Sequence, residues 1–167
     1  DFKGLVVEKI KKWLNSFGWG AKTNIDLPAE SAGFVPYPAW KKENFTDAVG
    51  KIWYLGDTYN LSIGQGYIQI TPLQVAVAFS AIANGGTLYQ PEIVKEIIDS
   101  SVGSPQGNDK NIITKIPPKI LNQGFFDKIN LEAVRRGMRD AVIYGSSTIL
   151  NSLPVEAAAK TGTAPSP

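Results

Sequence analysis

The 167-residue sequence contains neither cysteine nor histidine. Without cysteine, these residues can form no disulfide framework and supply no thiol nucleophile. Without histidine, a Ser-His-Asp triad and histidine-based metal sites are excluded within them. Any acyl transfer or hydrolysis by this chain must therefore rest on lysine, carboxylates, hydroxyls or backbone N–H groups.

Strong net charge and long apolar runs are also missing. The formal net charge is +2 with 19% charged residues, which gives no indication of nucleic acid binding. The apolar run Val75–Ala83 is much shorter than the about 18 residues of a membrane span, so no segment is predicted to cross a membrane. A hydrophobic content of 43% is typical of a globular chain, and 167 residues can bury a sizeable core.

The stretch Leu61–Gly86 predicts a central helix. Thr71 has the features of an N-cap, with Pro72 at the first helical position and Gln74 at the capping-box position. No charged residue occurs between Thr71 and Asn84, so the helix is expected to be buried around most of its circumference. The Asn-Gly-Gly sequence that begins at Asn84 ends it.

The rest of the chain alternates predicted helices, strands and loops. The predicted regular segments are an amphipathic helix over Asp1–Phe17, extended pieces over Tyr67–Ile70 and Ile112–Ile116, a strand over Pro91–Asp99, a helix over Leu131–Ile143 with Asn130 as N-cap, and a strand-like run over Pro154–Ala159. The predicted irregular segments are the connector 17–36, the loops 36–40 and 53–60, and a mobile loop over 100–111. The EIVKEII segment within Pro91–Asp99 is also compatible with a helix. In the loop 53–60, Asp57 and Asn60 are expected to satisfy backbone groups.

Several motifs occur in a fixed order along the chain. They are FGWGAKTNIDLPAE at 17–30, WYLGDTYNLSIGQG at 53–66, TPLQ at 71–74, ANGG at 83–86 and KTGTA at 160–164. Together they resemble the transpeptidase domain of class B penicillin-binding proteins, and most of all its elongation-type members, penicillin-binding protein 2. The resemblance covers nearly the whole chain. It implies an α+β fold of the β-lactamase-like type, with an antiparallel sheet flanked by helices and incomplete in this chain.

The residues Lys160, Thr161, Gly162 and Thr163 carry the chemistry that this resemblance implies. A peptide substrate can bind by adding a strand to a sheet edge, and a glycine there allows close backbone approach. The resemblance implies that the hydroxyls of Thr161 and Thr163 hold the substrate's terminal carboxylate. It further implies that the Thr163 N–H is an oxyanion-hole donor, and that Lys160 supplies positive charge and helps to relay a proton. An ordinary strand end without a catalytic role is the alternative interpretation.

The nucleophile of this family is the serine of an S-x-x-K motif, and a second motif is S-x-N. No serine in this sequence has lysine at +3 or asparagine at +2. We therefore expect residues 1–167 to be the C-terminal portion of one transpeptidase domain, which lacks a nucleophile and is inactive alone.

The resemblance implies a serine D,D-transpeptidase that cross-links peptidoglycan stem peptides and is acylated by β-lactams. Its implied partners are stem peptides, β-lactams, the missing N-terminal half of the domain and cell-wall elongation proteins, with no cofactor, metal or nucleic acid. The full-length protein would be anchored in the cell membrane, with its catalytic domain in the periplasm or outside the cell.

Two other functions stay open at this point. One is a non-catalytic module of the same fold that binds peptidoglycan or β-lactams. The other is a β-lactamase or penicillin sensor, which shares K-T-G, although the GDT-x-N and TPLQ blocks argue against it because they are typical of the transpeptidases.

Overall fold

The computed structural model describes residues 4–98 and 112–162, and it has the predicted α+β composition. In chain order its elements are α1 (Val7–Ser16), α2 (Pro38–Asn44), α3 (Leu55–Ser62), α4 (Pro72–Ala83), β1 (Thr87–Tyr89), β2 (Glu96–Ile98), β3 (Ile112–Lys115), β4 (Ile120–Gln123), α5 (Lys128–Ile143) and the 3-10 helix η1 (Thr148–Ser152). None of the helices in the described ranges has the length and apolar character needed to cross a bilayer.

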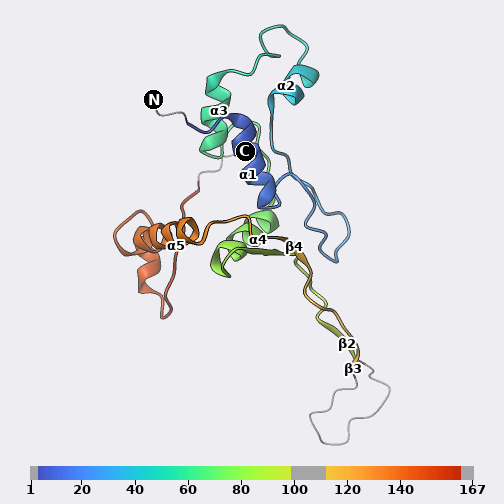
Figure 1. Ribbon diagram of the computed structural model, residues 1–167, viewed down its shortest axis with the longest axis vertical. Helices are drawn as coiled ribbons and strands as arrows, with labels where there is room; N and C mark the ends of the chain where they lie inside the picture. The colour runs from blue at the N-terminus through green and yellow to red at the C-terminus, as the bar shows by residue number, and fades with distance from the viewer. Residues whose placement is uncertain (1–3, 99–111, 163–167) are drawn as a thin grey trace, which may run out of the picture.

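The strands form a long antiparallel ribbon that projects from the helices (Figure 1). β1 pairs with β4 near the helices, and β2 pairs with β3 further out. Between the two pairs, the N–H of Gln90 donates to the carbonyl of Lys119 at 2.8 Å, and the N–H of Ile116 donates to that of Lys95 at 3.0 Å. The strands predicted over Pro91–Asp99 and Ile112–Ile116 are confirmed in part, as β2 and β3, and the mobile loop predicted at 100–111 lies outside the described residues. β1 and β4 lie outside the predicted strands.

α4 forms the centre of the core together with β1. Val77, Ala81 and Leu88 are buried against one another, and Leu121 and Phe125 pack onto them from β4 and the turn that follows it. The cap of α4 is as the sequence predicts. The Thr71 hydroxyl accepts from the N–H of Gln74 at 3.1 Å, and the Gln74 amide oxygen accepts from the N–H of Thr71 at 2.9 Å.

One face of α4 is not covered, which corrects the prediction of burial around most of the helix. Val75 is 37% exposed and Phe79 is 36% exposed, whereas Val77, Ala78 and Ala81 on the other side are buried. The apolar sequence predicts how much surface the helix needs to bury, but not which side has a neighbour. Within the described residues, the ribbon and the connector cover only one side.

The side chain of Gln74 joins α4 to the connector that follows α1. Gln74 is 1% exposed, and its amide nitrogen donates to the carbonyls of Ala21 at 2.7 Å and Ala32 at 2.8 Å. Next to it, Gly33 has a φ of 61°. A Cβ on Gly33 would lie 2.6 Å from the Gln74 amide oxygen and 2.5 Å from the carbonyl oxygen of Gln69, so no other residue fits there without movement.

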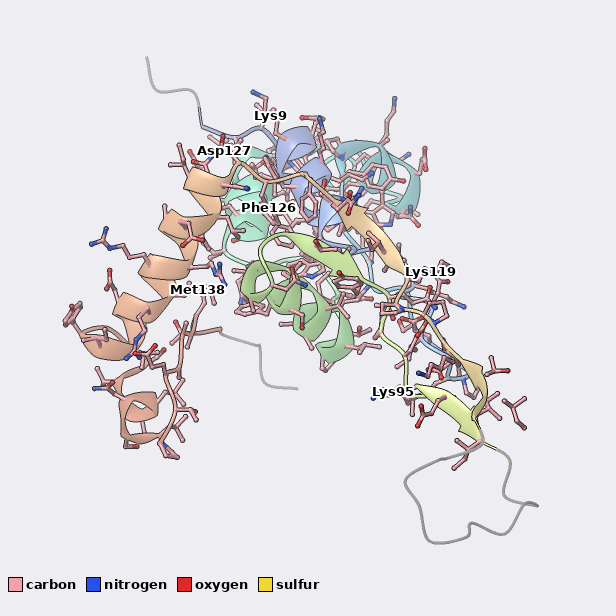
Figure 2. The ribbon with its side chains drawn as sticks, turned by 60° about the horizontal axis from the view of Figure 1, so that its bottom comes forward. Lys9, Lys95, Lys119, Phe126, Asp127 and Met138 are labelled. Atoms are coloured by element: carbon pink, nitrogen blue, oxygen red, sulfur yellow. The ribbon has the colours of Figure 1, made fainter. Side chains whose placement is uncertain are left out.

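Aromatic rings attach α1 to the segment between β4 and α5. Phe17 contacts Phe125 and Phe126 edge-on, with ring centres 5.5 Å and 5.0 Å apart, and Trp13 stacks on Phe126 at 6.3 Å. Phe126 lies where the chain passes from the ribbon into α5 (Figure 2). This cluster brings the first helix of the chain beside residues more than 100 positions later.

Two predicted helix starts are wrong. α1 begins at Val7 and not at Asp1, since Gly4–Val6 are not helical and residues 1–3 lie outside the described part. α5 begins three residues before the predicted start at Leu131. Its N-cap is Asp127, whose carboxylate accepts from the N–H of Ile129 at 2.8 Å, so Asn130 lies inside the first turn.

Two segments predicted as loops are helices. α2 occupies most of the loop expected at 36–40 and extends beyond it, with Pro38 at its first position, where the missing N–H costs nothing. α3 occupies most of the loop expected at 53–60. The Asp57 carboxylate accepts from the N–H of Tyr54 at 2.8 Å, which confirms its expected bond to the backbone but places that bond at a helix start.

Replacing Gln74 by alanine should destabilise the protein by about 3 kcal/mol, because two carbonyls and one N–H would lose their partner in a buried place. Urea-unfolding midpoints of wild type and Gln74→Ala measure this difference. Gln69→Ala is the matched control, since the side chain of Gln69 is exposed. Equal midpoints for the two variants would contradict the role given to Gln74.

Candidate active site

The segment that leads into K-T-G runs along α5 without forming a strand. The N–H of Ala159 donates to the carbonyl of Met138 at 3.0 Å, and the guanidinium of Arg139 donates to the carbonyl of Ala157 at 2.8 Å. Figure 2 labels Met138, on the helix beside this segment. The strand predicted over Pro154–Ala159 is therefore wrong in the described structure. A strand needs a second strand to pair with, and the neighbour here is a helix.

Lys160, Thr161 and Gly162 lie together and are exposed. The Lys160 ammonium donates to the carbonyl of Thr161 at 2.8 Å and lies 3.4 Å from its hydroxyl. A Cβ placed on Gly162 would meet no atom within 4 Å among the residues described. Thr163, the other predicted site residue, lies outside the described residues. The described part of the motif thus presents a cation, a hydroxyl and an uncrowded backbone.

The GDT-x-N block takes part in a largely buried ion pair that the sequence does not predict. The Lys41 ammonium lies 2.7 Å from the carboxylate of Asp57, and Lys41 is only 4% exposed. The same ammonium lies 5.5–5.8 Å from the ring centres of Phe45, Tyr54 and Tyr67. These rings and the carboxylate stabilise the buried charge, and so attach α2 to α3.

An apolar cleft of about 1220 Å³ lies between α1 and the GDT-x-N block. Leu5, Ile10 and Trp13 line it on the α1 side, and Trp53 and Tyr59 line it on the other. Lys160–Gly162 are not among the residues that line this cleft. Nowhere in residues 4–98 and 112–162 do three His, Cys, Asp or Glu side chains gather in a way that could hold a metal ion.

Two carboxylates of the TNIDLPAE block fasten the connector. Glu30 accepts from the Thr23 hydroxyl at 2.5 Å, from the Thr23 N–H at 2.6 Å and from the Asn24 N–H at 2.9 Å. Asp26 accepts from the N–H groups of Ile93 and Val94 in the ribbon, at 2.8 Å and 2.9 Å. The motif residues of this block thus have a structural role in the described chain.

These hydrogen bonds shift the pKa of both carboxyls. The pKa of Asp26 lies below its ordinary value of 3.8 because the N–H groups of Ile93 and Val94 stabilise its charged form. For Glu30, desolvation raises the pKa, but the bonds from Thr23 and Asn24 and the charge of Lys22 outweigh it. The pKa of Glu30 therefore also lies below its ordinary value, which is 4.5.

A family model described as the penicillin binding protein transpeptidase domain matches residues 3–166. The chain therefore belongs to the penicillin-binding protein transpeptidase family, as its motifs predict. It is 30% identical over 158 residues to the peptidoglycan D,D-transpeptidase MrdA of Acinetobacter baumannii, covering 95% of this chain and 22% of that protein. It is 37% identical to penicillin-binding protein H of Bacillus subtilis, covering 93% of this chain and 20% of that protein. The chain thus spans about a fifth of the length of these curated relatives.

Solved structures show the same relationship. Penicillin-binding protein 2 of Helicobacter pylori, in a complex with MreC, superposes with a TM-score of 0.71 at 33% identity, over 96% of this chain and 26% of that one. Penicillin-binding protein 2B of Streptococcus pneumoniae superposes with a TM-score of 0.73 at 26% identity, over 98% and 25%. The helices and small antiparallel sheets described above are thus part of the transpeptidase fold.

Acid should destabilise the protein through Asp26 and Glu30. Both carboxyls have a lower pKa when folded than when unfolded, so their stabilisation is complete above their ordinary pKa values and is lost as the pH falls through the folded ones. The urea midpoint should therefore fall between about pH 5 and pH 3. The double variant Asp26→Asn/Glu30→Gln should show a flatter profile, whereas Glu43→Gln, at an exposed position, should keep the wild-type slope. Identical profiles for all three proteins would contradict this assignment.

Proposed function

We propose that this chain is the K-T-G-bearing part of a serine D,D-transpeptidase that cross-links peptidoglycan stem peptides and is acylated by β-lactams. The observation that carries the proposal is the exposed Lys160–Gly162 segment, with open space around Gly162, in a chain of the transpeptidase family. The relative from Acinetobacter baumannii is itself named a peptidoglycan D,D-transpeptidase.

In the proposed reaction, the hydroxyl of a serine in an S-x-x-K motif attacks the carbonyl carbon of the penultimate D-alanine of a stem peptide. The bond to the terminal D-alanine breaks, and that residue leaves with a proton on its amine. The amine of a neighbouring peptide then attacks the acyl-serine, which forms the cross-link and frees the serine hydroxyl. Because no serine of this sequence lies in an S-x-x-K motif, the proposal requires that chain beyond these 167 residues supply it.

The residues of the motif have distinct roles in this proposal. Lys160 places a positive charge beside the acylation site and helps to relay protons, which no histidine of this chain can do. The hydroxyls of Thr161 and Thr163 hold the terminal carboxylate of the substrate, and the Thr163 N–H donates to the oxyanion. Gly162 lets the backbone of the substrate lie close to the backbone of the enzyme.

The proposed setting is that of the elongation-type enzymes. One relative, penicillin-binding protein 2 of Helicobacter pylori, has been solved in a complex with MreC. By analogy, we propose that the full-length protein containing this chain works together with cell-wall elongation proteins. It would be anchored in the cell membrane, with the catalytic domain in the periplasm or outside the cell.

A non-catalytic module that binds peptidoglycan or β-lactams is the second candidate. The exposed Lys160–Gly162 segment also fits this candidate, because its ammonium and hydroxyl can bind a ligand without reacting with it. The two candidates differ in one step, since only the enzyme forms a covalent bond to its ligand.

Labelling with a fluorescent penicillin separates the two candidates. The 167-residue chain alone should give no covalently labelled band on a denaturing gel, because it lacks the nucleophile. The complete protein that contains this chain should be labelled. An unlabelled complete protein would favour the binding module, and a labelled band from the chain alone would overturn the roles proposed here.

Gly162→Val in the complete protein should abolish acylation by penicillin and leave the melting temperature within about 2 °C of wild type. A side chain at Gly162 meets no atom within 4 Å in the described structure, so a strong effect on acylation requires a ligand that lies against Gly162. Gly137→Val is the matched control, since Gly137 is also exposed and without neighbours within 4 Å but lies in α5. Normal acylation of the Gly162→Val variant would show that K-T-G is not part of the active site.

A further inference from the structure

Two arginines of α5 donate to carbonyls outside their own helix. The guanidinium of Arg135 donates to the carbonyl of Ala83 at the end of α4 at 2.5 Å. The guanidinium of Arg139, one helical turn later, donates to the carbonyl of Ala157 at 2.8 Å. Arg136 lies between them in the sequence and is exposed. Arg135 thus joins α5 to the end of α4, and Arg139 joins α5 to the segment that leads directly into K-T-G.

The hydrogen bond from Arg139 is one of two that connect residues 156–162 to other described residues. Among the described residues, the hydrogen bonds that connect 156–162 to the rest of the chain are Arg139 to Ala157 and the N–H of Ala159 to the carbonyl of Met138. Those of Lys160 stay within the motif, since they run to Thr161. Within the described residues, the backbone just before Lys160 is thus joined to α5 by these two hydrogen bonds.

We propose that Arg139 is a positioning residue for the K-T-G segment. Its guanidinium fixes the carbonyl of Ala157, and the adjacent bond at Ala159 fixes the backbone one residue before Lys160. Arg139 itself does not touch the substrate. This inference rests on the proposed function, because it assigns to Arg139 the orientation of residues that bind the substrate there.

The chemistry of the contact favours arginine over lysine. A guanidinium is planar and carries several N–H donors in fixed directions, so it holds a carbonyl in a defined orientation. An ammonium can donate to the same carbonyl, but it does so from a flexible stem and without directional constraint. Arg139→Lys should therefore restore part of the function that Arg139→Ala loses.

The first experiment measures acylation of the complete protein by penicillin over a range of concentrations. This separates the affinity of the first, non-covalent complex from the rate of acylation within it. Arg139→Ala should lower the rate within the complex by about 10- to 100-fold, as expected when reacting groups are slightly misplaced. Arg139→Lys should recover part of this loss. Arg136→Ala, at an exposed position on the same helix, should acylate at the wild-type rate.

The second experiment measures hydrogen exchange of backbone amides in the same proteins. In Arg139→Ala, the amide of Ala159 should exchange faster, while the amides of α5 keep their protection. Faster exchange spread along α5 would mean that Arg139 only stabilises the helix, and would overturn the positioning role.

The kinetic outcomes distinguish this inference from the function on which it rests. If the wild-type protein is acylated and Arg139→Ala is acylated equally fast, the positioning role is wrong and the proposed function stands. An equal loss of rate in Arg139→Ala and Arg136→Ala would also overturn the positioning role. If the wild-type protein is not acylated at all, the proposed function fails, and the role of Arg139 in it fails as well.

Discussion

The side-chain amide of Gln74 is the interaction on which the arrangement of the described chain depends. It is buried at the start of α4, where it closes the cap of that helix and donates to two carbonyls of the connector. The space beside it is so restricted that Gly33 admits no Cβ. The connector next pairs with the segment before α4, through Phe34 and Gln69. The start of the central helix and the course of the connector are therefore fixed together.

The candidate site is linked to this centre through α5. α4 packs on the ribbon, and Arg135 of α5 donates to the carbonyl at the end of α4. The next turn of α5 holds the segment that leads into Lys160. Lys160–Gly162 are thus exposed, while the residues just before them are hydrogen-bonded to α5, an arrangement compatible with the proposed binding of a ligand in a fixed geometry. The buried pair of Lys41 and Asp57 has a parallel role at the other motif region, where it joins α2 to α3.

Local signals predicted α4 well, because the cap, the proline at the first turn and the Asn-Gly-Gly end all lie within a few residues of the helix. α3 differs from the prediction, because Gly56 and the polar residues after it indicate a loop, yet the Asp57 carboxylate caps a helix there by accepting from the N–H of Tyr54. The ion pair of Lys41 could not be predicted, since its partner is 16 positions away and neither residue shows its burial in the sequence. Motif order predicts the chemistry of K-T-G, and the roles of Lys160, Thr161, Gly162 and Thr163 stay a prediction. The attachment of this motif to α5 is not predictable, because the hydrogen bonds of Arg139 and Ala159 go to backbone carbonyls and leave no trace in the sequence pattern.

The contact of Asp26 with the ribbon has a mechanical consequence. A two-stranded ribbon that projects alone is only marginally stable. Partway along this one, the carboxylate of Asp26 in the connector accepts hydrogen bonds from the N–H groups of Ile93 and Val94. We expect the portion nearer the helices to move together with them, and bending to occur mainly in the β2–β3 pair, which lies beyond this contact. A load on that outer portion would pass through Asp26 into the connector and from there to α4. The carboxylate of Asp26 is therefore the point at which the ribbon and the connector are hydrogen-bonded to each other.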